Sequence, residues 1–125
     1  MQKNSNDSAE IISKAGKLYD YSFFENMGSV NAEFISNIKS IFIQTIPPTS
    51  EQLVKDCEAG AWDAAAKSAH KLKSSIDTLN IECLKKRVRY IEQSAKDLVD
   101  LDSLLSESLI VNDVIGIIVT QMEQE

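Results

Sequence analysis

The chain has few of the residues that interrupt helices. Its 125 residues include only four glycines and two prolines, which favours long helices with short connections. No uninterrupted apolar run approaches ~20 residues, so we expect no membrane-spanning segment. Residues 1–10 are polar and lack the basic and apolar regions of a signal peptide. These absences predict a soluble, cytoplasmic, helical protein.

Residues that bind metals or act as nucleophiles are equally few. Cys57 and Cys83 have neither a metal-like nor a redox-like spacing, so we interpret both as small buried apolar residues in a reducing compartment. His70 is the only histidine, so no second histidine or thiolate pair completes a metal or haem site. No serine or cysteine with an activating histidine can be named. We predict no metal site and no cofactor.

The remaining composition is that of an ordinary globular domain, with 43% apolar and 26% charged residues. A net charge of −6 disfavours nucleic acid or an anionic membrane as the main partner. We expect a polar, partly disordered segment over residues 1–18, although Ile11, Ile12 and Leu18 can dock part of it. Residues 19–125 are expected to form one helical domain, which acts as a monomer.

Helix signals appear early in that domain. Ser22 and Glu25 have the spacing of a capping box for a short helix that ends at Met27, before Gly28. Asn31 or Ser29 can cap a second helix. This helix carries an apolar face of Phe34, Ile38, Ile41, Phe42 and Thr45.

Two adjacent prolines interrupt the second helix at Pro47 and Pro48, because neither donates a backbone hydrogen bond. The pattern resumes at Leu53 and stops near Gly60. One long kinked helix and two short helices both fit.

The apolar spacing of the remaining chain predicts three more helices. The third runs from Trp62 to Leu79, and Asn80 takes the helix-end position because asparagine tolerates left-handed backbone. The fourth carries a stripe from Ile81 to Leu98. The last runs from about residue 102 to Met122, and its strand-like run 114–119 has no partner strand elsewhere. The fold class is therefore all-α: an antiparallel, up-down-up-down four-helix bundle with a short N-terminal helix.

His70 is predicted to point away from the core of this bundle. Successive helical residues turn by ~100°, which places His70 roughly 130° from the centre of the apolar stripe on the third helix. Its neighbours on the same side are small or charged: Ala66, Lys67, Lys73, Ser74 and, two turns along, Asp77. On this geometry alone, a solvated surface histidine beside solvated lysines is the more usual interpretation.

The segment around His70 resembles the histidine-containing phosphotransfer (HPt) domain. The family's motif is His-x-Leu-Lys-Gly followed by two small residues, and residues 69–75 read AHKLKSS. The likeness continues through residues 79–92, which read LNIECLKKRVRYIE. Upstream it includes Phe34-Ile35, Phe42, Pro47, Leu53 and the AGAWD of residues 59–63, so it covers about residues 19–95.

The resemblance implies a phosphorelay intermediate rather than an enzyme. His70 would accept a phosphoryl group from a receiver-domain aspartate or a hybrid sensor histidine kinase and pass it to a response regulator, with Mg²⁺ supplied by the receiver. Lys73 and Lys67 would stabilise the phosphate, while Ala66, Ser74 and Asp77 would lie at the docking face. Ser74 and Asn80 both stand where the family usually has glycine.

Two other functions stay open. The first is the phosphoacceptor helix pair of a histidine kinase. Such a pair has an acidic residue directly after the histidine and is followed by an ATP-binding domain, whereas Lys71 follows the histidine in this chain. A helical adaptor that binds receivers without phosphorylation is the second alternative. The basic residues of the run 85–89 suit a solvated face or the attraction of an acidic receiver surface.

Overall fold

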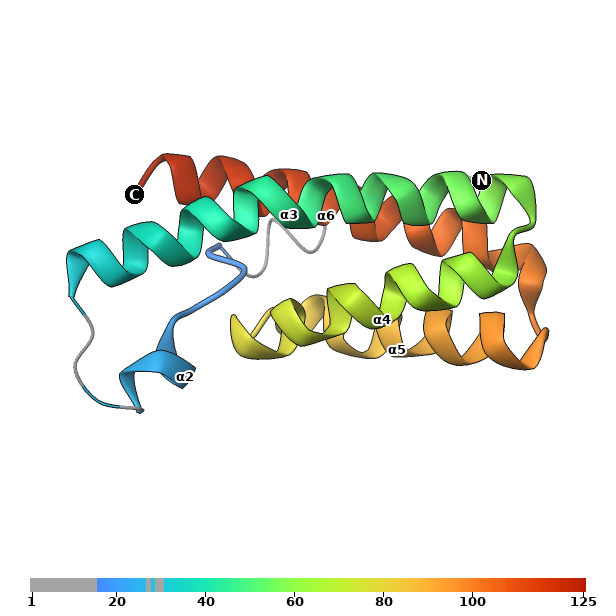
Figure 1. The fold of residues 1–125 in the computed structure, drawn as a ribbon, viewed down its shortest axis with the longest axis horizontal. Helices are drawn as coiled ribbons and strands as arrows, with labels where there is room; N and C mark the ends of the chain where they lie inside the picture. Colours follow the sequence, from blue (N-terminus) through green and yellow to red (C-terminus); the bar gives the residue numbers. More distant parts are fainter. Residues whose placement is uncertain (1–15, 27, 29–30) are drawn as a thin grey trace.

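The computed structural model describes residues 16–26, 28 and 31–125, and this part of the chain contains helices and no strand (Figure 1). The elements are α2 (Ser22–Glu25), α3 (Ala32–Ala59), α4 (Trp62–Thr78), α5 (Glu82–Asp97), the 3-10 turn η1 (Leu101–Ser103) and α6 (Leu104–Glu123). The all-α prediction is confirmed, and so is the helical interpretation of the last segment.

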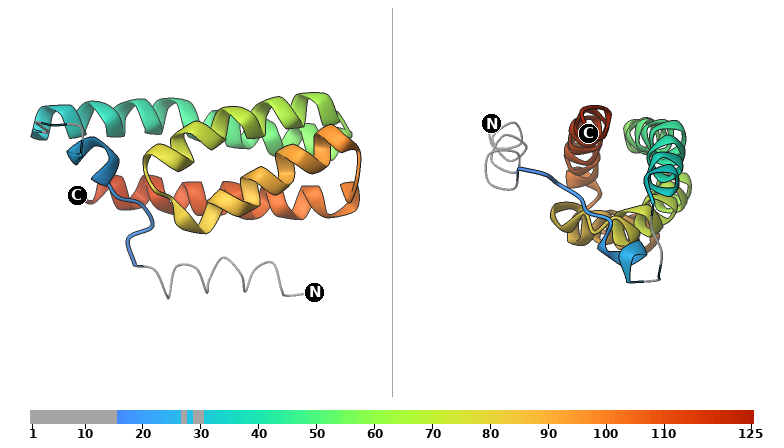
Figure 2. Two further views of the ribbon diagram at one scale, coloured as in Figure 1. Left: turned by 90° about the horizontal axis from the view of Figure 1, so that it is seen from below. Right: turned by 90° about the vertical axis from the view of Figure 1, so that its left-hand side faces the viewer.

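The four long helices form a bundle. Helix α3 packs on α4 and α6, and α5 packs on the same two helices, so each long helix has two neighbours. Figure 1 shows α3 and α6 along one side and α4 and α5 along the other, and the end-on view of Figure 2 shows the same grouping. Short α2 lies beside one end of the bundle.

The apolar stripes predicted for the helices form the core between them. The third-helix stripe is buried from Ala65 to Leu79, while Trp62 at its start is half-buried. The largest fully buried side chains come from all four long helices and from the N-cap of α5: Leu53, Leu72, Ile76, Ile81, Leu84, Val88, Ile91, Leu104, Ile110, Ile115, Ile118 and Met122. Burial of these side chains, at about 1.5–3 kcal/mol each, is the main force that assembles the bundle.

Helix α3 is a single helix that continues through Pro47 and Pro48. The hydroxyls of Thr45 and Thr49, which flank the prolines, donate to carbonyls one turn earlier at 2.7 and 2.8 Å. The alternative of two short helices is therefore wrong. A 28-residue helix packed on two neighbours tolerates the lost backbone hydrogen bonds because tertiary contacts hold both halves.

The predicted apolar face of α3 is only partly correct. Phe42 is buried, but Ile41 is 61% exposed and Phe34 is 40% exposed. Phe34 instead packs edge-on against Phe24 of α2, with ring centroids 5.4 Å apart. Helix α2 therefore covers part of the face that the sequence assigned to the main core.

The predicted helix caps meet different outcomes. Asn31 caps α3, and its side chain accepts a hydrogen bond from the Phe34 amide at 2.8 Å, as predicted. The capping box is wrong, because Ser22 is already inside α2 and donates through its amide and hydroxyl to Asp20 at 3.0 and 2.6 Å. Met27 and Ser29 lie outside the described residues.

The turns agree better with the sequence. Asn80 has a φ of 53° between α4 and α5, as predicted for a left-handed helix end. Leu98, which was assigned to the fourth apolar stripe, instead ends α5 in the same backbone region and is 62% exposed. Cys57 is buried as expected, whereas Cys83 is only half-buried.

Residues 16–21 lie across one end of the bundle. Leu18 and Tyr19 are buried, and the Leu18 amide donates to Gln121 of α6 at 3.0 Å. The expected docking of Leu18 is confirmed, while Ile11 and Ile12 lie outside the described residues.

The last helical stretch is long and apolar enough to cross a membrane, although it contains no uninterrupted apolar run of that length. Leu101–Glu123 is the one stretch of the described chain whose length and mean hydropathy of 1.6 suffice to cross a membrane. In the bundle, side chains of α6 such as Val111, Val114 and Ile118 are fully buried in the core. The buried side of α6 therefore contributes its apolar residues to the packing of the core.

Candidate functional site

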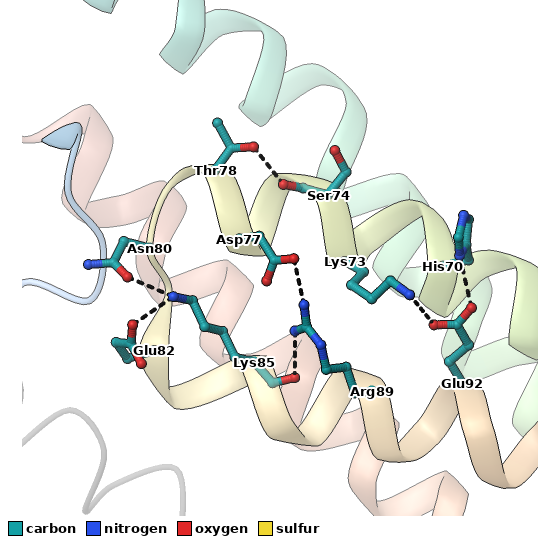
Figure 3. A network of polar contacts seen from close by, with 10 residues as sticks. All are labelled: His70, Lys73, Ser74, Asp77, Thr78, Asn80, Glu82, Lys85, Arg89 and Glu92. Carbon is teal, nitrogen blue, oxygen red and sulfur yellow. Dashed lines mark hydrogen bonds and ion pairs between the residues drawn. The ribbon is translucent and has the colours of Figure 1, made fainter. Parts of the chain in front are cut away.

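The α4 helix presents His70 to solvent. Its side chain is 67% exposed, which confirms the direction predicted from helical periodicity. Nδ1 of the ring lies 2.8 Å from Oε2 of Glu92 on α5, the neighbouring helix (Figure 3). The histidine is therefore not simply solvated: one ring nitrogen is held while the rest of the ring is exposed.

Glu92 is a buried carboxylate surrounded by cations. It is 5% exposed, and its Oε1 accepts a hydrogen bond from Lys73 Nζ at 2.8 Å (Figure 3). Its Oε2 lies 3.3 Å from Lys96 Nζ. Burial raises the pKa of Glu92, but the hydrogen bonds from Lys73, His70 and Lys96 outweigh it and lower the pKa to about 2. Glu92 is therefore ionised at neutral pH.

The ionised carboxylate decides which ring nitrogen of His70 carries the proton. An ionised carboxylate only accepts hydrogen bonds, so Nδ1 must be the donor in the contact with Glu92. In the neutral imidazole, Nε2 then carries the free lone pair. The site presents an oriented nucleophilic nitrogen to solvent.

A groove of about 470 Å³ opens beside the imidazole. Its lining residues come from α4 and α5: Asp63, Ala66, Lys67, His70, Lys71, Glu92 and Lys96. Three of these side chains are lysines, although the whole chain carries a net charge of −6. The groove therefore combines a nucleophile with cations that attract an anion.

The two lysines predicted to stabilise a phosphate, Lys73 and Lys67, lie in different positions relative to the groove. Lys73 is 29% exposed and bound to Glu92, and it is not among the residues that line the groove. Lys67 lines the groove and pairs with Asp63 one turn earlier at 3.2 Å.

The residues predicted for the docking face lie along α4 on either side of His70. Ala66 lines the groove but is only 5% exposed, because most of it packs in the core. Ser74 is exposed one turn from the histidine. Asp77 lies a further turn along and pairs with Arg89 of α5 at 2.6 Å, and the hydrogen bond from Arg89 lowers the pKa of Asp77 (Figure 3).

Two site residues received no role from the sequence, Glu92 and Lys96. A signal for Glu92 was present, since it stands one turn after Val88 and one turn before Ala95, both buried. A carboxylate on an apolar helix face must have cationic or hydrogen-bonding partners. For Lys96 the spacing of one turn from Glu92 is the only local signal.

Fold and site together define a class of protein: a helical bundle that presents one exposed, oriented histidine. The family model described as Hpt domain matches residues 37–124, a range that includes His70 and Glu92, and the chain belongs to this family. Hpt domains serve phosphotransfer in two-component signalling, where they interact with receiver domains and kinases. No curated protein and no solved structure matches the chain.

Proposed function

We propose that His70 accepts a phosphoryl group from a receiver-domain aspartate, or from a hybrid sensor histidine kinase, and passes it to a response regulator. The observation that carries this proposal is the 2.8 Å contact between Nδ1 and the ionised Glu92, which leaves Nε2 as the exposed nucleophile. The protein is a phosphocarrier without an ATP site of its own.

The transfer balances without an additional acid or base. The Nε2 lone pair attacks phosphorus in line, the N–P bond forms, and the acyl P–O bond of the receiver breaks. The receiver aspartate leaves as a carboxylate, and the positive charge left on the ring is stabilised by Glu92 through Nδ1–H. The return step to another aspartate reverses these events, and Mg²⁺ on the receiver neutralises charge at the aspartate.

The α4 face supplies docking as well as chemistry. Lys67 and Lys73 provide positive charge near the incoming phosphoryl group, and the acidic pocket of a receiver complements this local charge. Ala66 and Ser74 keep the surface beside the ring low, and Asp77 with its Arg89 partner forms an edge of the contact surface. We assign the same role to this face in both directions of transfer.

We further propose that the bundle has the up-down-up-down order and acts as a cytoplasmic monomer. The turns between α3 and α4 and between α4 and α5 are short, so consecutive helices reverse direction. Their contacts, together with that between α3 and α6, fit this order.

The test is transfer of acid-labile label from phosphorylated receiver domains to the wild-type protein and to His70→Gln. We expect label on the wild type alone, with equal thermal unfolding of both proteins as the control for folding. Receivers encoded alongside this chain are the first to use. If none of them labels the wild type, or if His70→Gln is labelled as well, the relay is refuted, and binding without labelling would identify a helical adaptor.

A further inference from the structure

The two oxygens of Glu92 have different partners. Oε1 is bound by Lys73 at 2.8 Å, whereas Oε2 is shared by His70 Nδ1 at 2.8 Å and Lys96 Nζ at 3.3 Å. The Lys96 ammonium and the His70 imidazole therefore share one oxygen of Glu92 and lie next to each other.

The two lysines also differ in exposure. The side chain of Lys96 is 57% exposed and lines the groove beside His70, while that of Lys73 is 29% exposed and does not line it. Moving Lys73 away would remove the donor that the structure shows on Oε1 and leave a buried charge poorly compensated. Moving Lys96 away leaves Glu92 with both of its shorter hydrogen bonds.

We propose that Lys96 is the ammonium group that turns from Glu92 to the phosphoryl oxygens on His70, whereas Lys73 remains on Glu92 as a positioning residue. This inference rests on the proposed phosphoryl transfer to His70. A phosphoryl group brings about −1.5 to −2 charges and three acceptor oxygens into the groove. A flexible, exposed lysine on the same groove reaches these oxygens by rotation of its side chain alone.

Lys96 acts on the transfer without gaining or losing a proton. As the N–P bond forms at Nε2 and the acyl P–O bond breaks, the aspartate carboxylate departs with the bonding electron pair. Lys96 then neutralises part of the negative charge on the phosphoryl oxygens, which the receiver's Mg²⁺ would neutralise before the transfer. The contact stabilises the phosphohistidine relative to the receiver acyl phosphate, and it thereby sets how far the transfer proceeds.

The experiment compares Lys96→Ala, Lys96→Arg and Lys73→Ala with the wild type. Lys55→Ala is the matched control, because it removes the same charge from an exposed position on α3 that does not line the groove. The readouts are the rate of label transfer from a phosphorylated receiver and the ³¹P chemical shift of phosphohistidine as a function of pH. Phosphoramidate, which phosphorylates histidine chemically, supplies the sample for the second readout.

We expect Lys96→Ala to slow transfer roughly five- to tenfold and to move the ³¹P shift and its pH midpoint, with partial recovery in Lys96→Arg. Lys55→Ala should match the wild type. If Lys96→Ala matches Lys55→Ala in both readouts, or if only Lys73→Ala moves the ³¹P shift, the proposal is overturned. Wild type that takes label from phosphoramidate but from no receiver contradicts the relay instead, and the ³¹P readout still decides the role of Lys96.

Discussion

Glu92 determines what His70 can do, although the two residues lie on different helices. The carboxylate is buried and stays ionised because Lys73, His70 and Lys96 all donate to it. The same contact that stabilises the charge of Glu92 fixes the imidazole ring and the position of its proton. An exposed histidine without such a partner has free rotamers and both tautomers, so the buried carboxylate is what makes this one a prepared nucleophile.

Removing the carboxylate should change the tautomer of His70. In the wild type at a pH where the imidazole is neutral, ¹⁵N NMR should show the proton on Nδ1, because Glu92 accepts from that atom. In Glu92→Ala we expect the proton to shift toward Nε2 and phosphoryl transfer to fall about tenfold. Glu58→Ala, an exposed change on α3, serves as the control. Persistence of the Nδ1 proton in Glu92→Ala would disprove this role.

The lowered pKa of Glu92 also predicts a pH dependence of stability. A carboxyl group whose pKa falls from 4.5 to about 2 on folding stabilises the native state above pH 4.5. This contribution, at most about 3 kcal/mol, is lost as the pH falls from 4.5 toward 2.

Urea unfolding of the wild type and Glu92→Gln at a series of pH values measures this contribution. The difference in the free energy of unfolding should be constant above pH 5 and should shrink below pH 4.5. The comparison isolates Glu92, since other titrating carboxyl groups are common to both proteins. A difference that stays constant down to pH 3 would show that the Glu92 pKa is not lowered.

Among the elements, the turn between α4 and α5 connects the helix of His70 to the helix of Glu92. Asn80 occupies the left-handed region in this turn, and its side chain contacts the segment before α2 and helix α5. Its amide donates to Asp20 at 2.8 Å, and its oxygen accepts from Lys85 at 2.8 Å. Asparagine thus replaces the glycine that is usual at this position in the family, and it adds two polar contacts.

Substitutions at Asn80 should separate these two contributions. Asn80→Gly keeps the backbone freedom and loses the side-chain contacts, whereas Asn80→Ala loses both. We expect Asn80→Ala to be less stable than Asn80→Gly by about 1 kcal/mol, the cost of a left-handed conformation for a residue with a Cβ. Thermal or urea unfolding measures the difference, and equal stabilities of the two variants would contradict the strain argument.

Across the whole molecule, Tyr19 and Tyr21 near the start of the described chain contact Glu125 at its end, and we call this set of contacts the clamp. The hydroxyl of Tyr19 donates to the Glu125 carboxylate, and the hydroxyl of Tyr21 lies 3.1 Å from the same group. Burial and the contact with Glu125 raise the pKa of both tyrosines, so both stay protonated and able to donate. Lys39 of α3 completes the cluster at 3.3 Å from Glu125.

The clamp should contribute to global stability and not to the chemistry of His70. Tyr19 is 3% exposed, so Tyr19→Ala should lower the free energy of unfolding by about 3 kcal/mol, whereas half-buried Tyr21 should cost less when replaced by alanine. At a temperature where the variant is folded, we expect unchanged label transfer to His70. Loss of transfer in folded Tyr19→Ala would show that the clamp also shapes the site.

Local patterns in the sequence were enough to predict the helices and the direction of His70. Both follow from local geometry, because the turn of ~100° per residue and the apolar spacing are properties of one helix. The same holds for Asn31 as a cap and for Asn80 as a helix end. Local signals failed where another segment competed: Asp20 took the Ser22 donors, and α2 covered Phe34.

The contacts of Glu92 with His70 across 22 residues and of Tyr19 with Glu125 across 106 follow from the tertiary structure. It also decided that α3 runs unbroken through Pro47 and Pro48. These outcomes depend on how one helix is shifted and rotated against the next, which is set by the packing of both surfaces and by the turn between them. Periodicity within a single helix carries no information about that register. The contact between His70 and Glu92 depends on it, because the two residues lie on different helices.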